Sequence, residues 1–374
     1  MSSQNRLQNV QQKLIQDGLD AVLIMSPAGA TYLSGCYLLT QTVIPTREAY
    51  VVVTRDGGVS YLICNIEEKS ARQDSWIADI HTYVEFEEEP ATAVSRIVRN
   101  HGLNQAKIGL ETHTLPAASY HLLQQELPNC TFTSWDKQLA EIMMIKEPAE
   151  VDAIEAAGMA TLNAITSAIT GAALGSSERD VFNAMMGKMM DQGLYPMFNV
   201  FASGGKTVLA HTEPDERIME PGDLIRLDVG GRWPSHYLSD MARTAVVGPP
   251  SPEQAESYQK LYNAQMAAIE AVGPGIPISD LYHICRDTYA KQNIPFHMPH
   301  IGHSMGIGLH EHPMIHPSEE TILQPNMVLN IEPFLLVPER NEGYHIEDLV
   351  VVTETGYRFL TTPTPELIQM PTGS

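Results

Sequence analysis

The sequence lacks any apolar run long enough to cross a bilayer. No stretch of its 374 residues approaches the roughly 20 apolar positions that a membrane-spanning helix requires. Residues 1–16 place Leu7, Val10, Leu14 and Ile15 at helical spacing, and no basic segment followed by a long apolar run is present. They predict a surface helix rather than a signal peptide. We therefore expect a soluble protein without a membrane partner.

Basic residues and paired cysteines are also scarce. The chain has 23 Lys and Arg residues against 45 Asp and Glu residues, a formal net charge of −22. This balance argues against binding to nucleic acid or to an anionic membrane. The four cysteines, Cys36, Cys64, Cys130 and Cys285, show no CxxC spacing of a zinc or redox site. Free thiols in a reducing compartment are expected, which indicates the cytoplasm.

The chain has no complete phosphate-binding loop. Residues 203–207, SGGKT, are similar to the end of one, but the motif requires a glycine where Val200 stands. This excludes a nucleotide site there. We expect the glycines instead to let a loop approach the active site.

The length and pattern of the chain predict two domains, residues 1–135 and 136–374. The first alternates short strands and helices, and Asp56-Gly57-Gly58 separates two apolar runs as a hairpin turn does. The second contains a long helix that begins near Pro148. Its helix pairs alternate with strand-like segments, which favours an α+β sheet covered on one face.

Five candidate metal ligands lie in separate motifs of the second domain. Asp228 is in LDVGG, Asp240 in LSDMART, His303 in GHSMGIGLHEHP, Glu332 in NIEP and Glu347 in HIEDLVVV. The four carboxylates adjoin apolar, β-branched runs, where burial of an unpaired carboxylate costs on the order of several kcal/mol. Four carboxylates and one imidazole suit two divalent first-row ions better than one tetrahedral zinc. The motifs therefore predict a metal site.

From about residue 140 to about 363, these motifs resemble the catalytic domain of the prolidase, aminopeptidase P, methionine aminopeptidase and creatinase superfamily. Residues 1–135 are similar to the smaller N-terminal domain of its prolidase, aminopeptidase P and creatinase branches. The resemblance is strongest to Xaa-Pro dipeptidase-like members. It implies the pita-bread fold, a curved antiparallel sheet covered by helices, preceded by an α/β domain. It also implies a homodimer.

The resemblance assigns a role to each candidate ligand. Asp228 would bind one ion, and Asp240 would bridge both. His303 and Glu332 would bind the other ion, and Glu347 would bridge again. Two ions of manganese, cobalt, zinc or iron would lower the pKa of a shared water, so that a bridging hydroxide attacks the substrate. Glu332 would act as the general base.

Four histidines are further candidates. The resemblance implies that His310 hydrogen-bonds the developing oxyanion or the substrate, and that His211 faces the scissile amide. We expect His300 and His345 to bind substrate. For each of them, the alternative is a loop or core histidine with a structural hydrogen bond. We expect other histidines near His303 to be solvated or to orient neighbours rather than to form another metal site: His297, His312 and His316.

Two departures from the family pattern bear on the site. The segment between Asp228 and Asp240 is one residue longer than in most family peptidases and has His236 where a glycine is usual. We expect a bulge or a longer loop to re-aim Asp240. His345 stands where prolidases and aminopeptidases P commonly have an arginine. A constant, forked cation is thus replaced by a titratable ring, which leaves the recognition of a peptide carboxylate open.

The sequence thus predicts a metallohydrolase that cleaves an amide C–N bond, with Xaa-Pro dipeptides or short Xaa-Pro peptides as substrates. The preference for proline comes from the resemblance alone. One alternative is a metal-dependent hydrolase or lyase of a small non-peptide compound on the same scaffold. Another is a catalytically inactive binding member, which the complete set of ligands disfavours.

Overall fold

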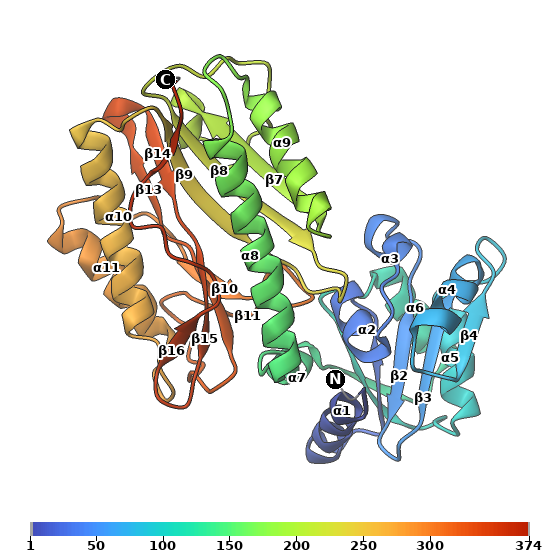
Figure 1. Cartoon of the computed structure of the whole chain (residues 1–374). Helices are drawn as coiled ribbons and strands as arrows, with labels where there is room; N and C mark the ends of the chain where they lie inside the picture. The colour runs from blue at the N-terminus through green and yellow to red at the C-terminus, as the bar shows by residue number, and fades with distance from the viewer. Residues whose placement is uncertain (1–2, 373–374) are drawn as a thin grey trace. The chain divides into compact units, whose positions relative to one another are not determined.

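The computed structural model describes residues 3–372, which divide between Met143 and Met144 into two compact units (Figure 1). Each unit has its own sheets, helices and apolar core. Helix α7 (Asp136–Met143), which begins at the domain boundary expected from the sequence, is part of the first unit.

The first unit contains a six-stranded sheet with the order β4-β3-β2-β1-β5-β6. The strands are β1 (Ala21–Ile24), β2 (Tyr50–Thr54), β3 (Val59–Cys64), β4 (Ile80–Tyr83), β5 (Lys107–Leu110) and β6 (Thr131–Ser134). Strands β2 and β3 form the antiparallel hairpin predicted from Asp56-Gly57-Gly58. Gly57 has a φ of 108° in this turn, a conformation that favours glycine.

Helices and one 3-10 turn complete the first unit: α1 (Ser3–Asp17), α2 (Pro27–Ser34), α3 (Leu39–Val43), η1 (Asn65–Glu67), α4 (Glu68–Asp74), α5 (Pro90–Asn100), α6 (Ala117–Glu126) and α7. The predicted N-terminal helix is confirmed as α1. Val10 and Leu14 are fully buried, whereas Ile15 is 60% exposed. The buried stripe of this helix is therefore narrower than its apolar pattern indicates.

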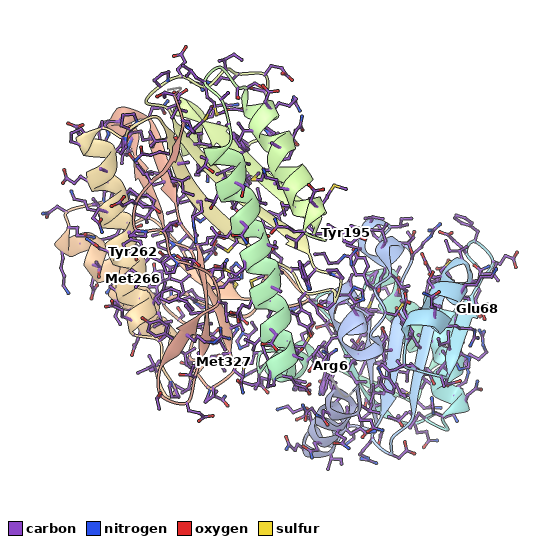
Figure 2. All side chains as sticks on the ribbon, in the orientation of Figure 1. Arg6, Glu68, Tyr195, Tyr262, Met266 and Met327 are labelled. Carbon is purple, nitrogen blue, oxygen red and sulfur yellow. The ribbon has the colours of Figure 1, made fainter. Side chains whose placement is uncertain are left out.

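Two helix pairs belong to the second unit: α8 (Pro148–Thr170) with α9 (Glu178–Asp191), and α10 (Pro252–Glu270) with α11 (Ile278–Lys291). Capping residues in the sequence mark the starts of α9 and α10. Ser177 caps α9 in a reciprocal capping box with Asp180, and Ser251 caps α10 directly before Pro252. Side chains of α10, including Tyr262 and Met266, pack on the core of this unit (Figure 2).

The strands of the second unit form a four-stranded sheet, β17-β9-β8-β7, a five-stranded sheet, β11-β10-β12-β15-β16, and the hairpin β13-β14. The 3-10 turns are η2 (Gly204–Val208) and η3 (Pro338–Arg340). The strands are β7 (Tyr195–Ser203), β8 (Leu224–Arg232), β9 (Met241–Val247), β10 (Gly302–Ser304), β11 (Glu311–Met314), β12 (Val328–Ile331), β13 (Phe334–Val337), β14 (Glu342–His345), β15 (Asp348–Val352), β16 (Tyr357–Phe359) and β17 (Ile368–Met370). Neighbouring strands pair antiparallel except β17 with β9.

Strand β15 is buried on both faces. Leu349 and Val351 belong to the apolar cluster that contains α8 and α9 residues, whereas Val350 and Val352 belong to the cluster of α10 and α11. The expectation of a sheet covered on one face is therefore wrong for this strand. Its continuous apolar run is typical of a strand with two buried faces, because no polar residue alternates with the apolar ones.

Other sequence expectations concern absences. None of the helices described between residues 3 and 372 is long and apolar enough to cross a membrane. All four cysteines are free, and only Cys130 is not fully buried.

Lys206, the lysine of the SGGKT segment, forms ion pairs with Glu178 at 2.5 Å and Asp215 at 3.0 Å. Carboxylates of the protein itself thus neutralise this lysine.

Substitution by alanine at two glycines of the second unit should change the free energy of unfolding in opposite directions. Gly302 has a φ of 149°, and a Cβ atom there would lie 2.0 Å from the carbonyl oxygen of Asn330 on the paired strand. Gly302→Ala should lower the free energy of unfolding by about 3 kcal/mol. Gly187, inside α9, has nothing within 4 Å of its Cβ position, so Gly187→Ala should raise it by about 0.5–1 kcal/mol. Denaturant unfolding of the two variants measures both changes; equal effects would contradict the steric argument.

Candidate active site

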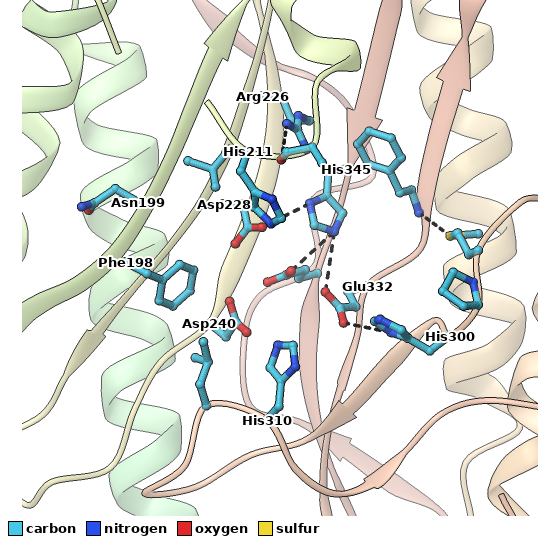
Figure 3. A pocket seen from close by; sticks show the side chains of 17 residues that line it. Phe198, Asn199, His211, Arg226, Asp228, Asp240, His300, His310, Glu332 and His345 are labelled. Carbon is cyan, nitrogen blue, oxygen red and sulfur yellow. Dashed lines mark hydrogen bonds and ion pairs between the residues drawn. The ribbon is translucent and has the colours of Figure 1, made fainter. Parts of the chain in front are cut away.

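A cavity of about 690 Å³ in the second unit contains all four predicted carboxylates (Figure 3). Asp228 lies within β8, and Asp240 immediately precedes β9. Glu332 directly follows β12, and Glu347 directly precedes β15. The acidic side chains thus come from four strand segments that are distant in the sequence.

Strand pairing explains why these segments meet. Asp228 lies opposite Ala242 in the β8–β9 pair, and Asp240 precedes Ala242 by two residues, so both carboxylates are on one face. Ile331 lies opposite Asp348 in the β12–β15 pair, which makes Glu332 and Glu347 neighbours. The amide of Glu347 also donates to the carbonyl of Ala242 at 3.1 Å. This hydrogen bond connects the two sheets at the site.

The segment between Asp228 and Asp240 contains no bulge in the β8–β9 pairing. Residues Leu224–Val229 pair with β9 without a register shift, and the isolated bridge between Arg232 and Leu238 continues the same register. The extra length lies in the turn, where His236 has a φ of 76°. Of the two alternatives expected for this segment, the bulge is absent from the β8–β9 pairing, which agrees with a longer turn.

His303, in β10, has the contacts of a metal-binding imidazole. Its Nδ1 is 3.0 Å from the carbonyl oxygen of Ser304. Because a carbonyl only accepts hydrogen bonds, the proton is on Nδ1 and the Nε2 lone pair is free. Nε2 lies 3.4 Å from Oδ2 of Asp240 and 3.4 Å from Oε1 of Glu332. The ring of His310 stacks on His303, with centroids 4.0 Å apart.

The other predicted histidines also line the cavity. His345 lies among the acids, with its Nε2 3.5 Å from Glu347 and its Nδ1 3.9 Å from Asp228. Nδ1 of His300 is 3.6 Å from Glu332. His211 follows η2 and lines the same cavity, whereas His312 and His316 lie beside Glu319 outside the lining.

Burial shifts the pKa values of the imidazoles and of the carboxylates in opposite directions. Burial lowers the pKa of His310 to about 4 and that of His345 to about 3. Burial, followed by the charges of neighbouring carboxylates, raises the pKa values of Asp240, Glu332 and Glu347 well above their usual range. Near neutral pH these histidines are therefore neutral, and the carboxylates need added positive charge to remain ionised.

The donor atoms of this site fit divalent metal ions. Two groups each contain three donor atoms that lie within 4.8 Å of one another. The first is Asp240, His303 and His310, and the second is Asp228, His345 and Glu347. Nε2 of His303 and Oε1 of Glu332 are buried without a hydrogen-bond partner. Carboxylate oxygens and imidazole nitrogens suit first-row divalent ions. The proximity of His310 and His345 to the acids extends the donor set that the sequence predicted.

Two buried ion pairs outside the cavity lining hold the backbone segments that carry site residues. Arg243 pairs with Asp348 at 2.7 Å, both fully buried, and also donates to the carbonyl oxygens of Ala242 and Glu347. The arginine thus holds the backbone beside two of the carboxylates. Lys146 pairs with Glu311 at 2.6 Å, and Glu311 accepts the amide of Gly308 at 2.8 Å. This second pair holds the loop that carries His310.

Sequence reasoning did not identify three residues that shape the site. Arg226 and Phe334 line the cavity, and Nδ2 of Asn330 donates to Glu347 at 3.3 Å. Strand alternation could have indicated two of them. Arg226 precedes Asp228 by two residues, and Asn330 precedes Glu332 by two, so each pair points to one side of the chain. For Phe334, no such sequence signal is available.

Comparison with known proteins gives a consistent picture. Residues 152–354 match metallopeptidase family M24, and residues 6–145 match the creatinase/prolidase N-terminal domain. The chain belongs to metallopeptidase family M24. It is a peptidase-type hydrolase with a creatinase-type N-terminal domain, as its motifs predicted. The family's dependence on metal agrees with the donor set of the cavity.

Relatives of this peptidase span nearly its whole length. It is 29% identical over 366 residues to the Xaa-Pro dipeptidase of Pyrococcus furiosus, covering 97% of this chain and 99% of the relative. It is 30% identical over 356 residues to the Xaa-Pro dipeptidase of Pyrococcus horikoshii, covering 94% and 95%. The solved prolidase from Pyrococcus horikoshii OT3 matches with a TM-score of 0.84 at 28% identity, over 97% of this chain and 100% of that one.

The buried carboxylates predict how the stability of the metal-free protein depends on pH. Their pKa values are higher in the folded than in the unfolded chain, so the folded state holds more protons. The free energy of unfolding should therefore fall as pH rises from about 5 to 8, by about 1.4 kcal/mol per pH unit for each extra proton held.

Denaturant unfolding at several pH values, with a chelator and with Mn²⁺, measures this dependence. The added ion should stabilise the protein most at the upper end of the range, where the carboxylates are ionised. Coincident curves in chelator and in metal would show that the carboxylates bind no ion.

Proposed function

We propose that this peptidase hydrolyses the bond before proline in Xaa-Pro dipeptides, using two divalent metal ions. The convergence of four carboxylates in one cavity, with Nε2 of the buried His303 3.4 Å from both Asp240 and Glu332, is the observation that carries this proposal. Two relatives that match more than nine-tenths of the chain are named Xaa-Pro dipeptidases, and this supports the choice of substrate.

The proposed ligands are Asp228, Asp240, His303, Glu332 and Glu347. When bound, the ions would polarise the scissile carbonyl and make a water acidic enough to attack it. Glu332 is suited to accept a proton, because its Oε1 has no hydrogen-bond partner and burial raises its pKa. From there it can return the proton to the leaving nitrogen.

Four imidazoles line the cavity around the proposed reaction centre. We assign His310 to the oxyanion or the substrate, because its ring lies against His303. His211 is assigned to the scissile amide, and His300 and His345 to substrate binding. The low pKa values of His310 and His345 support roles as uncharged hydrogen-bonding groups at neutral pH.

The remaining features of the proposal concern the ions and the setting of the enzyme. Carboxylate-rich sites accept manganese, cobalt, zinc or iron, so the identity of the metal is set by supply as well as by geometry. Free cysteines support a cytoplasmic location. A homodimer is proposed on the family resemblance.

A hydrolysis panel tests the substrate assignment. With Mn²⁺ or Co²⁺ added, Xaa-Pro dipeptides should be cleaved at least 100-fold faster than dipeptides of the reversed order, Pro-Xaa, because only the former present the bond before proline. The panel should include longer Xaa-Pro peptides and small zwitterionic amides, with kcat/KM as the measurement. Turnover of the non-peptide amides alone would replace the peptidase assignment with the non-peptide alternative.

Asp240→Ala tests the proposed bridging ligand. Loss of a carboxylate shared by both ions should reduce bound metal from about two equivalents per chain to below one and lower kcat by at least about 1,000-fold. Elemental analysis and turnover are the two measurements. Asp287→Ala, at an exposed carboxylate of α11, is the matched control and should retain both. An Asp240→Ala variant with full metal content would exclude the bridging role.

A further inference from the structure

Arg226 is a buried cation in the wall of the cavity. It is the one lysine or arginine among the 17 lining side chains, all of them in the described chain. Its side chain is on β8, and the residue is 2% exposed. No ion pair found within residues 3–372 includes it. Its Nε is buried and has no hydrogen-bond partner.

The protein compensates this charge only in part. Nη2 of Arg226 donates to the carbonyl oxygens of Leu209 and Ala210, and the guanidinium lies 5.0 Å from the ring centroid of Phe334. A guanidinium remains charged at all physiological pH values, and a buried charge without a counter-ion is unfavourable. Its planar fork of N–H donors matches the two oxygens of a carboxylate. An anionic group of the substrate would satisfy it.

We propose that Arg226 binds the C-terminal carboxylate of the substrate and thereby selects dipeptides. This inference rests on the proposed function and specifies its substrate class. Burial, the unpartnered Nε and the lack of an ion pair together favour Arg226 as the anion-binding residue of the cavity. The acidic side chains on the other side of His211 and His345 would repel a carboxylate placed there (Figure 3).

The spacing of β8 sets the length of substrate that fits. Arg226 and Asp228 are alternate residues of one strand, so their side chains share a face and their Cα atoms are about 7 Å apart. From a scissile carbonyl held at the Asp228 end, one further residue spans about 3.5 Å, and a hydrogen bond adds about 3 Å. This spacing is compatible with a dipeptide whose carboxylate meets the guanidinium. One more residue would place the carboxylate about 3.5 Å farther along the chain.

The ring of Phe334 lies along this path. It contacts Arg226 on one side and meets His345 edge-on, with ring centroids 5.5 Å apart at 80°. An apolar ring surface beside a forked cation suits a residue that is apolar and ends in a carboxylate. A C-terminal proline has both properties.

The test compares an Xaa-Pro dipeptide, its C-terminal amide and the Xaa-Pro-Ala tripeptide in the metal-loaded enzyme. The wild type should cleave the free acid about 100-fold more efficiently than the amide, judged by kcat/KM. Arg226→Met should lose about 100-fold on the acid but no more than about 3-fold on the amide. Arg226→Lys keeps the positive charge but not the paired N–H donors of the guanidinium, so its kcat/KM on the acid should lie between those of the wild type and of Arg226→Met. The tripeptide should resemble the amide.

The amide separates carboxylate binding from a structural role. If Arg226 merely held the loop before His211 through Leu209 and Ala210, Arg226→Met would reduce cleavage of acid and amide equally, and the proposal would be overturned. Arg232→Met is a matched control on the same strand outside the cavity lining, and it should keep the wild-type ratio of acid to amide cleavage.

The same panel separates the two proposals. A wild-type enzyme that cleaves the acid and the amide equally well would reject the role of Arg226 while the proposed function stands. A wild-type enzyme that cleaves neither would reject the proposed function and, with it, the carboxylate assignment. Metal content measured on every variant verifies that the site is intact.

Discussion

Mutual repulsion of four clustered carboxylates, of which Asp240 and Glu347 are buried, is the constraint on which the second unit depends. Burial and neighbouring charge raise the pKa values of Asp240, Glu332 and Glu347, so the folded chain holds these groups together at a cost. The fold meets this cost with strand pairing and with the fully buried Arg243, which donates to the backbone beside the acids. Divalent ions would supply the positive charge that one arginine in the cavity wall does not.

The surroundings of the acids divide into two kinds. His303 and Asn330 contact carboxylate oxygens directly, whereas the pair of Lys146 with Glu311 acts through the loop before β11. Arg226 belongs to neither kind, because it lies within the cavity but no carboxylate of the protein pairs with it. The positive charge of Arg226 is thus not used to pair with the acids of the protein and is left for a ligand.

Several features were predictable from sequence because short-range rules govern them. Capping residues, the glycine turn of β2–β3 and acids beside apolar strands all carry local signals. The burial of β15 on both faces was not expected, because the alternation of helix pairs and strands favoured one covered face, although the continuous apolar run of this strand is typical of two buried faces. Nor could the sequence distinguish a bulge from a longer turn after Gly230, because both add one residue. The partners of Arg243 and Lys146 lie more than 100 residues away.

The turn around His236 has a consequence for how such chains can change in length. Strand side chains alternate between faces, so one residue added within β8 or β12 would rotate a carboxylate out of the cavity and destroy the cluster. One residue added in the turn leaves the β8–β9 pairing intact, as the bridge between Arg232 and Leu238 demonstrates. An insertion is therefore compatible with the site in the turn between β8 and β9, whereas a single-residue insertion within a strand that carries one of the acids is not.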